Sequence, residues 1–415
     1  MELERAGTTP ETIILEQGLK SNRKFLQLWI SSMVIGVSFS IYMLIETWYV
    51  VDKLNLSSML GMILMATTLP RIFLMIFGGV MVDRFNPSTI MSLSAGLRGF
   101  LMACLIIALY FDVLSIWVLF VFALFFGILD AFYWPANGSV LPSIVGKNQL
   151  TRANSIIQTT SNITFIIGPV IAGWLLGKSS YMFLFGFTGL LLMVGALIVF
   201  TVNNKGTKTR KSGSAWSSLK EGLIYVKNSP LLLSSMMIGI IVNLCLAGPG
   251  NMAGPIIVKD ILNGNSQDLS FIESAIAIGM VLGGLVIGIW NPTRKRGILS
   301  LSRLIALGCV FIFYSQVNSL WHCIVVSMVI GFLITAGDIP MRSLNQEKTD
   351  PDKMGRVSGI NSTISQGLVP LSFALTSIGL SLNISILTLL LVCGITLILY
   401  SCFGFWKFEA LRKAD

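Results

Sequence analysis

The feature of this sequence that most constrains its fold is a succession of long apolar stretches, each about as long as a helix that crosses a bilayer. Six of them occupy residues 25–50, 57–82, 88–110, 114–141, 154–177 and 181–202, and six more occupy residues 231–258, 269–291, 298–315, 320–341, 357–379 and 384–406. Hydrophobic residues make up 54% of the chain and charged residues only 12%, which is too apolar for a soluble surface. Strands of a membrane barrel would instead alternate over roughly ten residues. The sequence therefore predicts an all-α membrane protein with twelve transmembrane helices in the lipid bilayer.

The distribution of Lys and Arg predicts the orientation of these helices, because cytoplasmic loops next to spans are rich in positive charge. Of the 29 Lys and Arg residues, Lys53, Lys178 and Lys259 fall in loops on one side, Arg71 and Arg98 fall inside spans, and the other 24 fall on the opposite side. Both termini and the basic central segment are therefore expected in the cytoplasm, in a multi-pass protein of the cell membrane. The net charge of +10 follows from this topology, so nucleic-acid binding is not predicted.

The remaining chemistry of the sequence predicts no metal site and no disulfide framework. The six Cys residues are scattered through apolar stretches without a CxxC pair, and the single His322 stands beside Trp321 near a predicted loop. Residues 1–24 are charged and lack the apolar core of a signal peptide, so they are expected to form a cytoplasmic tail. No G-x-x-x-x-G-K-[ST] phosphate loop occurs, so ATP-driven pumping has no support in the sequence.

Similar residues recur at about half the chain length, as expected for a transporter built from two related halves. Gly79 and Gly284 lie 205 residues apart, Asp130 and Asp338 lie 208 apart, and Pro169 and Pro370 lie 201 apart. We therefore expect two six-helix bundles joined by a basic linker. The predicted parts are a cytoplasmic tail at 1–24, bundles at 25–202 and 231–406, a cytoplasmic linker at 203–230 and a second cytoplasmic tail at 407–415.

A short motif follows the second apolar stretch, where Gly79 opens the segment GVMVDR. This segment resembles the G-x-x-x-D-R signature of the major facilitator superfamily, and the resemblance covers nearly the whole chain. It implies twelve helices in two pseudo-symmetric six-helix halves, with this loop as a cytoplasmic latch in which Asp83 lies near a helix start and pairs with basic groups. An anion in such a place is stabilised by about 0.3–1 kcal/mol. The basic run usual after the motif is replaced by FNPST, so Arg84 and Arg152 are the candidate partners.

The fifth apolar stretch contains Gly168, Pro169 and Gly173, which resemble the antiporter signature G-x-x-x-G-P-x-x-G-G of exporters in this superfamily. Two glycines of the signature are replaced, by Thr164 and Ala172. Small residues let helices approach closely, and a proline bends a helix. Generic helix packing is the alternative reading, but the motif favours export over uptake.

Two longer segments, AFYWPANGSVLPSIVGKNQLTRANSIIQ and QEKTDPDKMGRVSGINSTISQGLVPL, are similar to the drug:proton antiporter branch with macrolide efflux proteins and enterobactin-type siderophore exporters. The resemblance implies that the protein is not an enzyme but a secondary active exporter of an amphipathic small molecule. It implies proton antiport, with the proton gradient as the energy source and no cofactor, and alternating access by rocking of one half against the other. The alternative is a facilitative channel or a non-transporting receptor. A chain with two such halves can work as a monomer.

Carboxylates inside the apolar stretches are the candidates for proton coupling, because charges at bilayer depth cost about 2.5–3.5 kcal/mol and usually face the protein interior. Glu46 lies in the first stretch only six residues before Asp52, so it is either a cavity group or an interfacial carboxylate. Asp130 and Asp338 lie at matching places in the fourth and tenth stretches. Asp338 stands one helical turn before Arg342, and an ion pair between them is the alternative to proton carriage.

Two arginines interrupt the apolar stretches, and each needs an anionic partner. Arg71 either neutralises Glu46 or Asp130, or faces the cavity and binds an anionic group of the substrate. For Arg98 we favour a structural pairing with a carboxylate. The R-x-x-x-G motif of drug exporters is absent, because Ala123 stands where its Arg would be.

The seventh stretch contains AGPGNMAGP at 247–255, whose glycines and prolines predict a broken helix that lines the pathway or acts as a gate, with a simple kink as the alternative. Asn243 and Asn251 are its polar candidates for the cavity. A drug or macrolide would be held mainly by aromatic and Met side chains, whereas a siderophore or other carboxylate metallophore would use Arg71 as well. The aromatic candidates are Tyr42, Trp48, Phe132 and Trp134.

Overall fold

The structure, a computed structural model, describes residues 19, 21–146, 149–202, 224–292, 294–350, 353, 357, 360–361 and 367–413. Secondary structure in these residues is helical throughout. The first half contains α2 (Arg23–Trp48), α3 (Leu60–Arg84), α4 (Pro87–Tyr110), α5 (Ile116–Ile144), α6 (Leu150–Leu176) and α7 (Tyr181–Phe200). The second contains α9 (Pro230–Ile256), α10 (Ser266–Trp290), α11 (Arg296–Tyr314), α12 (Leu320–Glu347), α14 (Val369–Ser381), α15 (Ile386–Lys407) and the short α16 (Glu409–Arg412).

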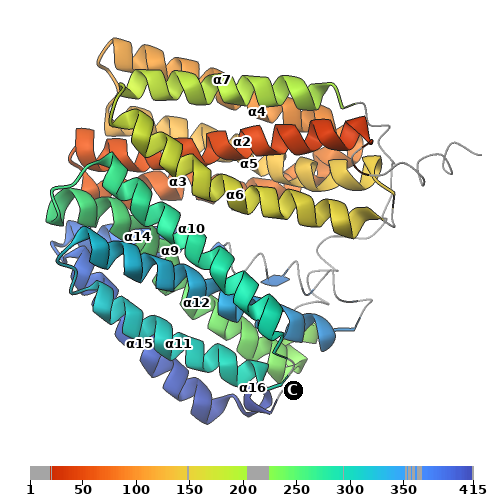
Figure 1. Ribbon diagram of the computed structural model, residues 1–415, viewed down its shortest axis with the longest axis vertical. Helices are drawn as coiled ribbons and strands as arrows, with labels where there is room; N and C mark the ends of the chain where they lie inside the picture. Colours follow the sequence, from red (N-terminus) through yellow and green to blue (C-terminus); the bar gives the residue numbers. More distant parts are fainter. Residues whose placement is uncertain are drawn as a thin grey trace, which may run out of the picture.

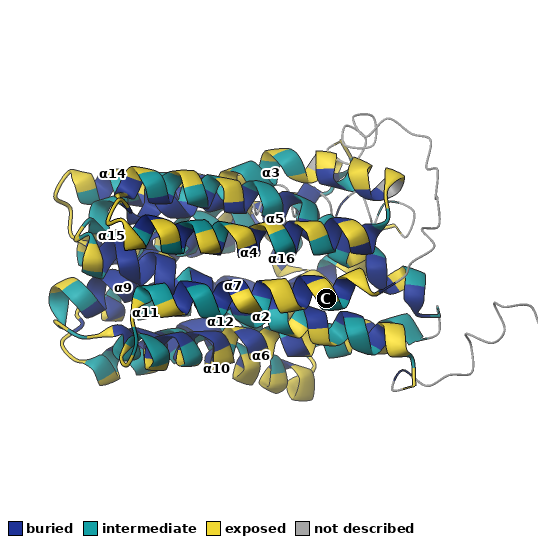
Figure 2. Cartoon of the chain, turned by 90° about the horizontal axis from the view of Figure 1, so that it is seen from above, coloured by how far each residue is buried: buried dark blue, intermediate teal, exposed yellow. Residues whose placement is uncertain are grey.

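The number of long helices agrees with the sequence prediction. Eleven helical segments in the described part of the chain are long and apolar enough to cross a membrane, and the shorter apolar α14 lies at the place of the predicted eleventh span. Many large apolar side chains point outward, among them Phe73, Trp117 and Ile289, which are 65%, 63% and 86% exposed. Figure 2 shows buried and exposed residues side by side along most helices. An apolar outer surface of this kind is suited to lipid and not to water.

Serine residues define where several of these helices begin. Ser115, Ser180, Ser229, Ser319 and Ser385 each precede a long helix, and each side chain accepts a hydrogen bond from the backbone N–H three residues later. This bond satisfies one of the N–H groups that a helix start leaves without a partner. The starts of these apolar helices are thus marked by serines whose side chains cap them.

The helices pack in the same pattern in both halves. In the first half α3 packs on α5, α4 on α7, and α2 on both α6 and α7. In the second half α10 packs on α12, α11 on α15, and α9 on both α14 and α15, which repeats that order of neighbours. The first long helices of the two halves also end alike, since α2 continues into a π-helix at Tyr49–Lys53 and α9 into one at Ile257–Ile261. The predicted fold of two pseudo-symmetric six-helix halves is confirmed.

The predicted break in the seventh span is wrong. α9 runs without interruption from Pro230 to Ile256 and contains both Pro249 and Pro255. Its glycines serve close packing instead: a Cβ at Gly248 would collide with Thr376 and with the backbone of Ser372 in α14. The Gly248 N–H donates to the Ser372 hydroxyl at 2.7 Å. Packing against a neighbouring helix can therefore maintain a helix despite its prolines.

The two halves meet at one end of the molecule. Figure 1 shows the helices of the second half approaching those of the first at one end and diverging toward the other. The contacts between halves are made mainly by α6 with α10 and by α3 with α14. Asp52 lies at the end where the halves meet, and we call this end the Asp52 end. The predicted linker, 203–230, and the predicted N-terminal tail, 1–24, lie largely outside the described residues, whereas most of the predicted C-terminal tail, 407–415, is described and contains α16.

Candidate functional site

A buried ion pair lies in the first half. The Asp130 carboxylate on α5 is 3.1 Å from an Arg98 guanidinium nitrogen on α4 and 3.5 Å from one of Arg71 on α3. Trp134, one helical turn after Asp130, donates its indole N–H to the carboxylate at 3.0 Å. The side chains of Arg98 and Asp130 are only 1% and 6% exposed. Of the alternatives for Arg71, the structure shows neutralisation of Asp130, and the predicted pairing of Arg98 with a carboxylate is confirmed.

Aromatic rings surround the arginines of this ion pair. The Arg98 guanidinium lies 4.6 Å from the ring centroid of Tyr133 and 5.1 Å from that of Phe126, and Arg71 lies 5.1 Å from that of Trp134. Cation–π contacts of this kind are stronger where water is excluded. The expected cavity residue Trp134 thus holds Arg71 and Asp130 in place.

Glu46 is fully buried in α2, and whether it is a cavity group or an interfacial carboxylate stays a prediction. Its Oε1 accepts a hydrogen bond of 2.6 Å from the hydroxyl of Tyr42, and its Oε2 has no partner among the described residues. The Tyr42 ring stacks on Phe126 with centroids 4.3 Å apart. Tyr42 therefore connects Glu46 to the aromatic cluster around Arg98.

The second half has an ion pair at the matching place, but not with the expected partner. Arg303 of α11 donates to Asp338 of α12 at 3.0 Å and also to the Ile334 carbonyl at 3.0 Å. The predicted Asp338–Arg342 pair is wrong, because Arg342 is exposed while Arg303 reaches across from the neighbouring helix. The side chains of Arg303 and Asp338 are 6% and 50% exposed. Arg303 lies 205 residues after Arg98, so the missed arginine was detectable by the same repeat that relates the aspartates.

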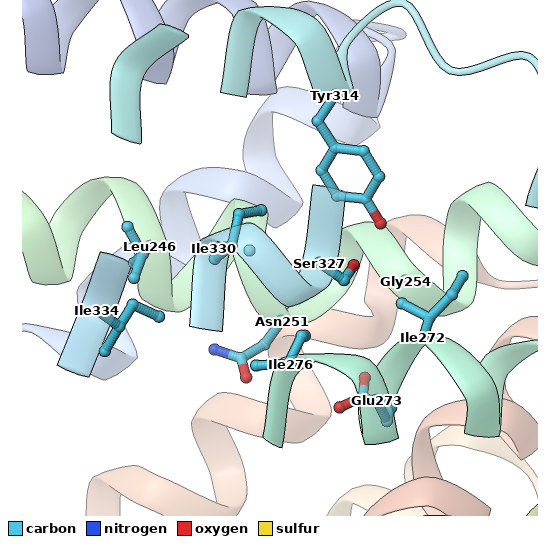
Figure 3. A pocket seen from close by; sticks show the side chains of 11 residues that line it. Leu246, Asn251, Gly254, Ile272, Glu273, Ile276, Tyr314, Ser327, Ile330 and Ile334 are labelled. Carbon is cyan, nitrogen blue, oxygen red and sulfur yellow. The ribbon is translucent and has the colours of Figure 1, made fainter. Parts of the chain in front are cut away.

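Two cavities adjoin each other inside the molecule. The first, of about 190 Å³, lies between the halves and is lined by side chains of α2, α3, α6, α9, α10 and α14. The second, of about 100 Å³, lies within the second half (Figure 3). Asn251 of α9 and Glu273 of α10 line both cavities.

The predicted cavity residues divide into two groups. Asn251 lines the cavity between the halves, as does Pro169 of the antiporter-type motif, whereas Tyr42 and Trp48 are buried inside the first half and line neither cavity. These two aromatic side chains lie on faces of α2 that pack against neighbouring helices. Phe132 and Asn243 are partly buried and line neither cavity, and the side-chain amide of Asn243 donates to the Gly239 carbonyl of its own helix.

Glu273 is a carboxylate inside a span that sequence reasoning missed. It lies in the predicted stretch 269–291, seven residues after the first residue of α10. Within the described part of the chain it has no hydrogen bond and no ion pair. The signal that would have found it is the rule already applied to Glu46: an ionisable residue within an apolar span is a candidate for function.

The halves are joined by polar contacts at the Asp52 end. Lys259 of the second half pairs with Asp52 of the first at 2.6 Å, and Tyr181 donates to the same carboxylate at 3.2 Å. The Ser57 hydroxyl donates to Asp260 at 2.8 Å, again across the halves. Along α10, the Ser266 and Ser274 hydroxyls donate to the Gly173 and Ile166 carbonyls of α6, each at 3.4 Å, so polar contacts between the halves continue along these two helices.

The glycines of the predicted antiporter motif lie at close helix contacts. A Cβ at Gly168 would collide with Ser40 of α2 in the same half. A Cβ at Gly173 would lie 2.5 Å from the Ser270 Cβ and 2.7 Å from the Ser266 carbonyl oxygen on α10 of the other half. The expected close approach of helices at this motif is therefore present, and Gly173 lies at the junction between the halves.

The proposed latch is described only in part. Asp83 and Arg84 are the last two residues of α3, and the Asn86 side chain caps α4 by accepting from the Ser88 N–H. The Asp83 side chain lies outside the described side chains, so its partner stays a prediction. Arg84 and Arg152 are exposed, and a Cβ at Gly79 would meet nothing within 4 Å.

Comparison with known protein families identifies the family to which this architecture belongs. The family model described as Major Facilitator Superfamily matches residues 28–374. The chain is 24% identical to Macrolide efflux protein A of Streptococcus pyogenes over 86% of this chain and 89% of that protein. It is 23% identical to the Staphyloferrin A transporter of Staphylococcus aureus over 85% and 89% of the two chains, and 24% identical to the Enterobactin exporter EntS of Escherichia coli O1:K1 / APEC over 68% and 67%. The predicted resemblance to macrolide efflux proteins and enterobactin exporters is confirmed.

Solved structures support the fold. The nucleoside transporter NupG aligns with a TM-score of 0.75 at 13% identity, over 94% of this chain and 100% of that one. A bacterial homologue of the lysosomal transporter Spinster, in an inward-facing and unoccupied conformation, aligns with a TM-score of 0.68 at 13% identity, over 96% and 98% of the two chains.

Proposed function

Because this chain belongs to the major facilitator superfamily and is a membrane transporter rather than an enzyme, we propose that it exports an amphipathic small molecule from the cytoplasm by proton antiport. Relatives named for macrolide efflux and for export of enterobactin support the direction of transport. The antiporter-type motif, whose Gly173 lies at the junction of α6 and α10, supports the same direction.

The observation that carries this proposal is the cavity of about 190 Å³ between the halves. Contacts between the halves surround the Asp52 end, whereas the helices diverge toward the opposite end (Figure 1). The distribution of Lys and Arg predicts that the Asp52 end faces the outside of the cell. With that orientation the protein is in an inward-facing state that takes up substrate from the cytoplasm, and rocking of the halves delivers it to the outside.

Proton coupling needs a carboxylate inside the spans, and no cofactor is required if the proton gradient supplies the energy. The candidates predicted from sequence are Glu46, Asp130 and Asp338, to which the structure adds Glu273. Two arginines neutralise Asp130, and one pairs with Asp338. Glu46 and Glu273 have no ion pair among the described residues, so they are the stronger candidates. Since the cavity lies between two halves of one chain, a monomer is sufficient.

The test is transport into everted membrane vesicles with an imposed pH gradient, acidic inside. We expect uptake of a radiolabelled macrolide, or of another cationic drug such as ethidium, that falls at least tenfold when nigericin dissipates the gradient. Vesicles without the protein are the control. Uptake that persists unchanged without any gradient would favour the alternative of a facilitative channel, and binding without uptake would favour a receptor.

A further inference from the structure

We propose that Glu273 and Asn251 form a recognition site for a protonated amine, so that the substrates are cationic amphiphiles and not carboxylate metallophores. This inference rests on the proposed function, because it names the substrate class of the same cavity.

The first argument is that Glu273, alone among the span carboxylates whose side chains the structure describes, combines access to a cavity with a lack of protein partners. Asp130 and Asp338 are held by arginines, and Glu46 is fully buried behind the cavity wall with Tyr42 as its donor. Glu273 lines both cavities and has no hydrogen bond or ion pair in the described part of the chain. An unpaired carboxylate in apolar surroundings is unfavourable unless a cation accompanies it. A substrate ammonium group would supply that cation.

The second argument comes from the donor and acceptor groups around Glu273. Asn251 lines both cavities, and its Nδ2 donates to the Ala247 carbonyl at 2.7 Å, which leaves the amide oxygen able to accept from a ligand. Figure 3 shows the side chains of Asn251 and Glu273 among those that line the pocket in the second half. Both residues therefore offer acceptors. A protonated amine can donate to both of these groups, and the Tyr314 and Ser327 hydroxyls that line the smaller cavity can accept from it as well. A carboxylate would instead be repelled by the Glu273 carboxylate.

The third argument is that no cationic side chain lines either cavity among the described residues. Arg71, expected to bind an anionic substrate group, is held by Asp130 and by the Trp134 ring. A carboxylate metallophore would thus meet a carboxylate and no guanidinium. Repulsion between the Glu273 carboxylate and a carboxylate of the ligand would strongly disfavour binding of such a ligand.

The walls indicate the shape of the apolar part of the substrate. The cavity between the halves presents aromatic rings and a thioether, from Phe39, Met43, Phe165 and Phe373. The smaller cavity presents branched aliphatic side chains, from Ile272, Ile276, Ile330 and Ile334. Since Asn251 and Glu273 line both, the amine would lie at the junction, with an aromatic body on one side and a small aliphatic substituent on the other.

The test is equilibrium binding to the full chain in lipid nanodiscs, without any gradient, at pH 7.5. Three probes share one fluorophore and differ in charge: dansylcadaverine carries an ammonium group, dansylamide is neutral, and dansylglycine carries a carboxylate. We expect dansylcadaverine to bind at least tenfold more tightly than dansylglycine. Glu273→Gln should weaken dansylcadaverine at least tenfold and change dansylamide less than twofold, while Glu273→Asp should retain part of the preference. Glu409→Gln, at the exposed α16, is the matched control.

Several outcomes would overturn the inference. Equal or tighter binding of dansylglycine by the unaltered protein, no binding of dansylcadaverine, or unchanged dansylcadaverine affinity in a folded Glu273→Gln variant would each do so. The ranking of the probes on the unaltered protein needs no variant, so it decides even if Glu273→Gln fails to fold. Transport that ignores the pH gradient would instead remove proton antiport and leave this ranking intact.

Discussion

At the scale of single residues, two related ion pairs differ in burial. Arg98 and Asp130 are almost completely enclosed, whereas Asp338 is half exposed beside the buried Arg303. A charge that is buried with its partner is costly to leave alone, and the aromatic rings around Arg98 exclude the water that could replace that partner. The ion pair of the first half is therefore expected to matter for stability.

Replacing Asp130 by Ala should destabilise the protein by about 3–5 kcal/mol, because Arg98 would remain buried without a full counter-charge. Unfolding in detergent, followed by tryptophan fluorescence, would measure the loss. The control is Asp350→Asn, which removes an exposed pair with Lys353 and should change stability by about 0.5 kcal/mol or less. Equal effects of the two changes would show that Arg98 finds water or another partner.

At the scale of helices, glycine positions determine how closely α6 approaches its neighbours. Gly173 lets α6 contact Ser266 and Ser270 of α10, and this contact is a large part of the junction between halves. Within a bilayer, helices associate through close packing of small residues, since lipid removes the usual hydrophobic driving force. The motif is thus as much a packing element as a signature of export.

Replacing Gly173 by Ala should disfavour the conformation closed at the Asp52 end, by about 1–3 kcal/mol, because the added methyl group overlaps α10. Spin labels on Asp112→Cys and Asn383→Cys, in loops of opposite halves and without the native cysteines, would report the distance across that end. We expect a longer-distance population to grow. Gly288→Ala, where a Cβ meets nothing within 4 Å, should leave the distances unchanged, and the same shift in both variants would argue against a specific contact.

At the scale of the whole molecule, polar groups hold the two halves together at the Asp52 end. The Asp52–Lys259 pair joins the end of the first span to that of the seventh, and Ser57 donates to Asp260 across the same boundary. Both charges of the pair are about one third exposed, at 32% each, so the pair is partly screened by water. Such a junction can hold one state and still open during a transport cycle.

Replacing Asp52 by Lys should weaken the closed state by about 1 kcal/mol, roughly a fivefold change in population, because two ammonium groups would face each other. Exchanging both charges, as Asp52→Lys with Lys259→Asp, should restore it. The same pair of spin labels would measure both effects, with Lys53→Ala as the control at a neighbouring exposed lysine. If the exchanged pair stays as open as the single change, the ion pair has no part in closure.

The sequence by itself determined the number of spans, their division into two related halves and the family. These follow from the length of apolar stretches and from motifs, which are local properties of the chain. The repeat that relates Asp130 to Asp338 also indicated correctly that the halves carry matching groups.

Only the tertiary structure decided which side chains meet and which face the cavity. Helices in a bilayer are apolar on every side, so the pattern of a span such as α10 does not distinguish the side facing lipid from the side facing protein. Packing of whole helices therefore placed Tyr42 in the interior, put Glu273 at the cavity, and gave Asp338 the partner Arg303 instead of Arg342.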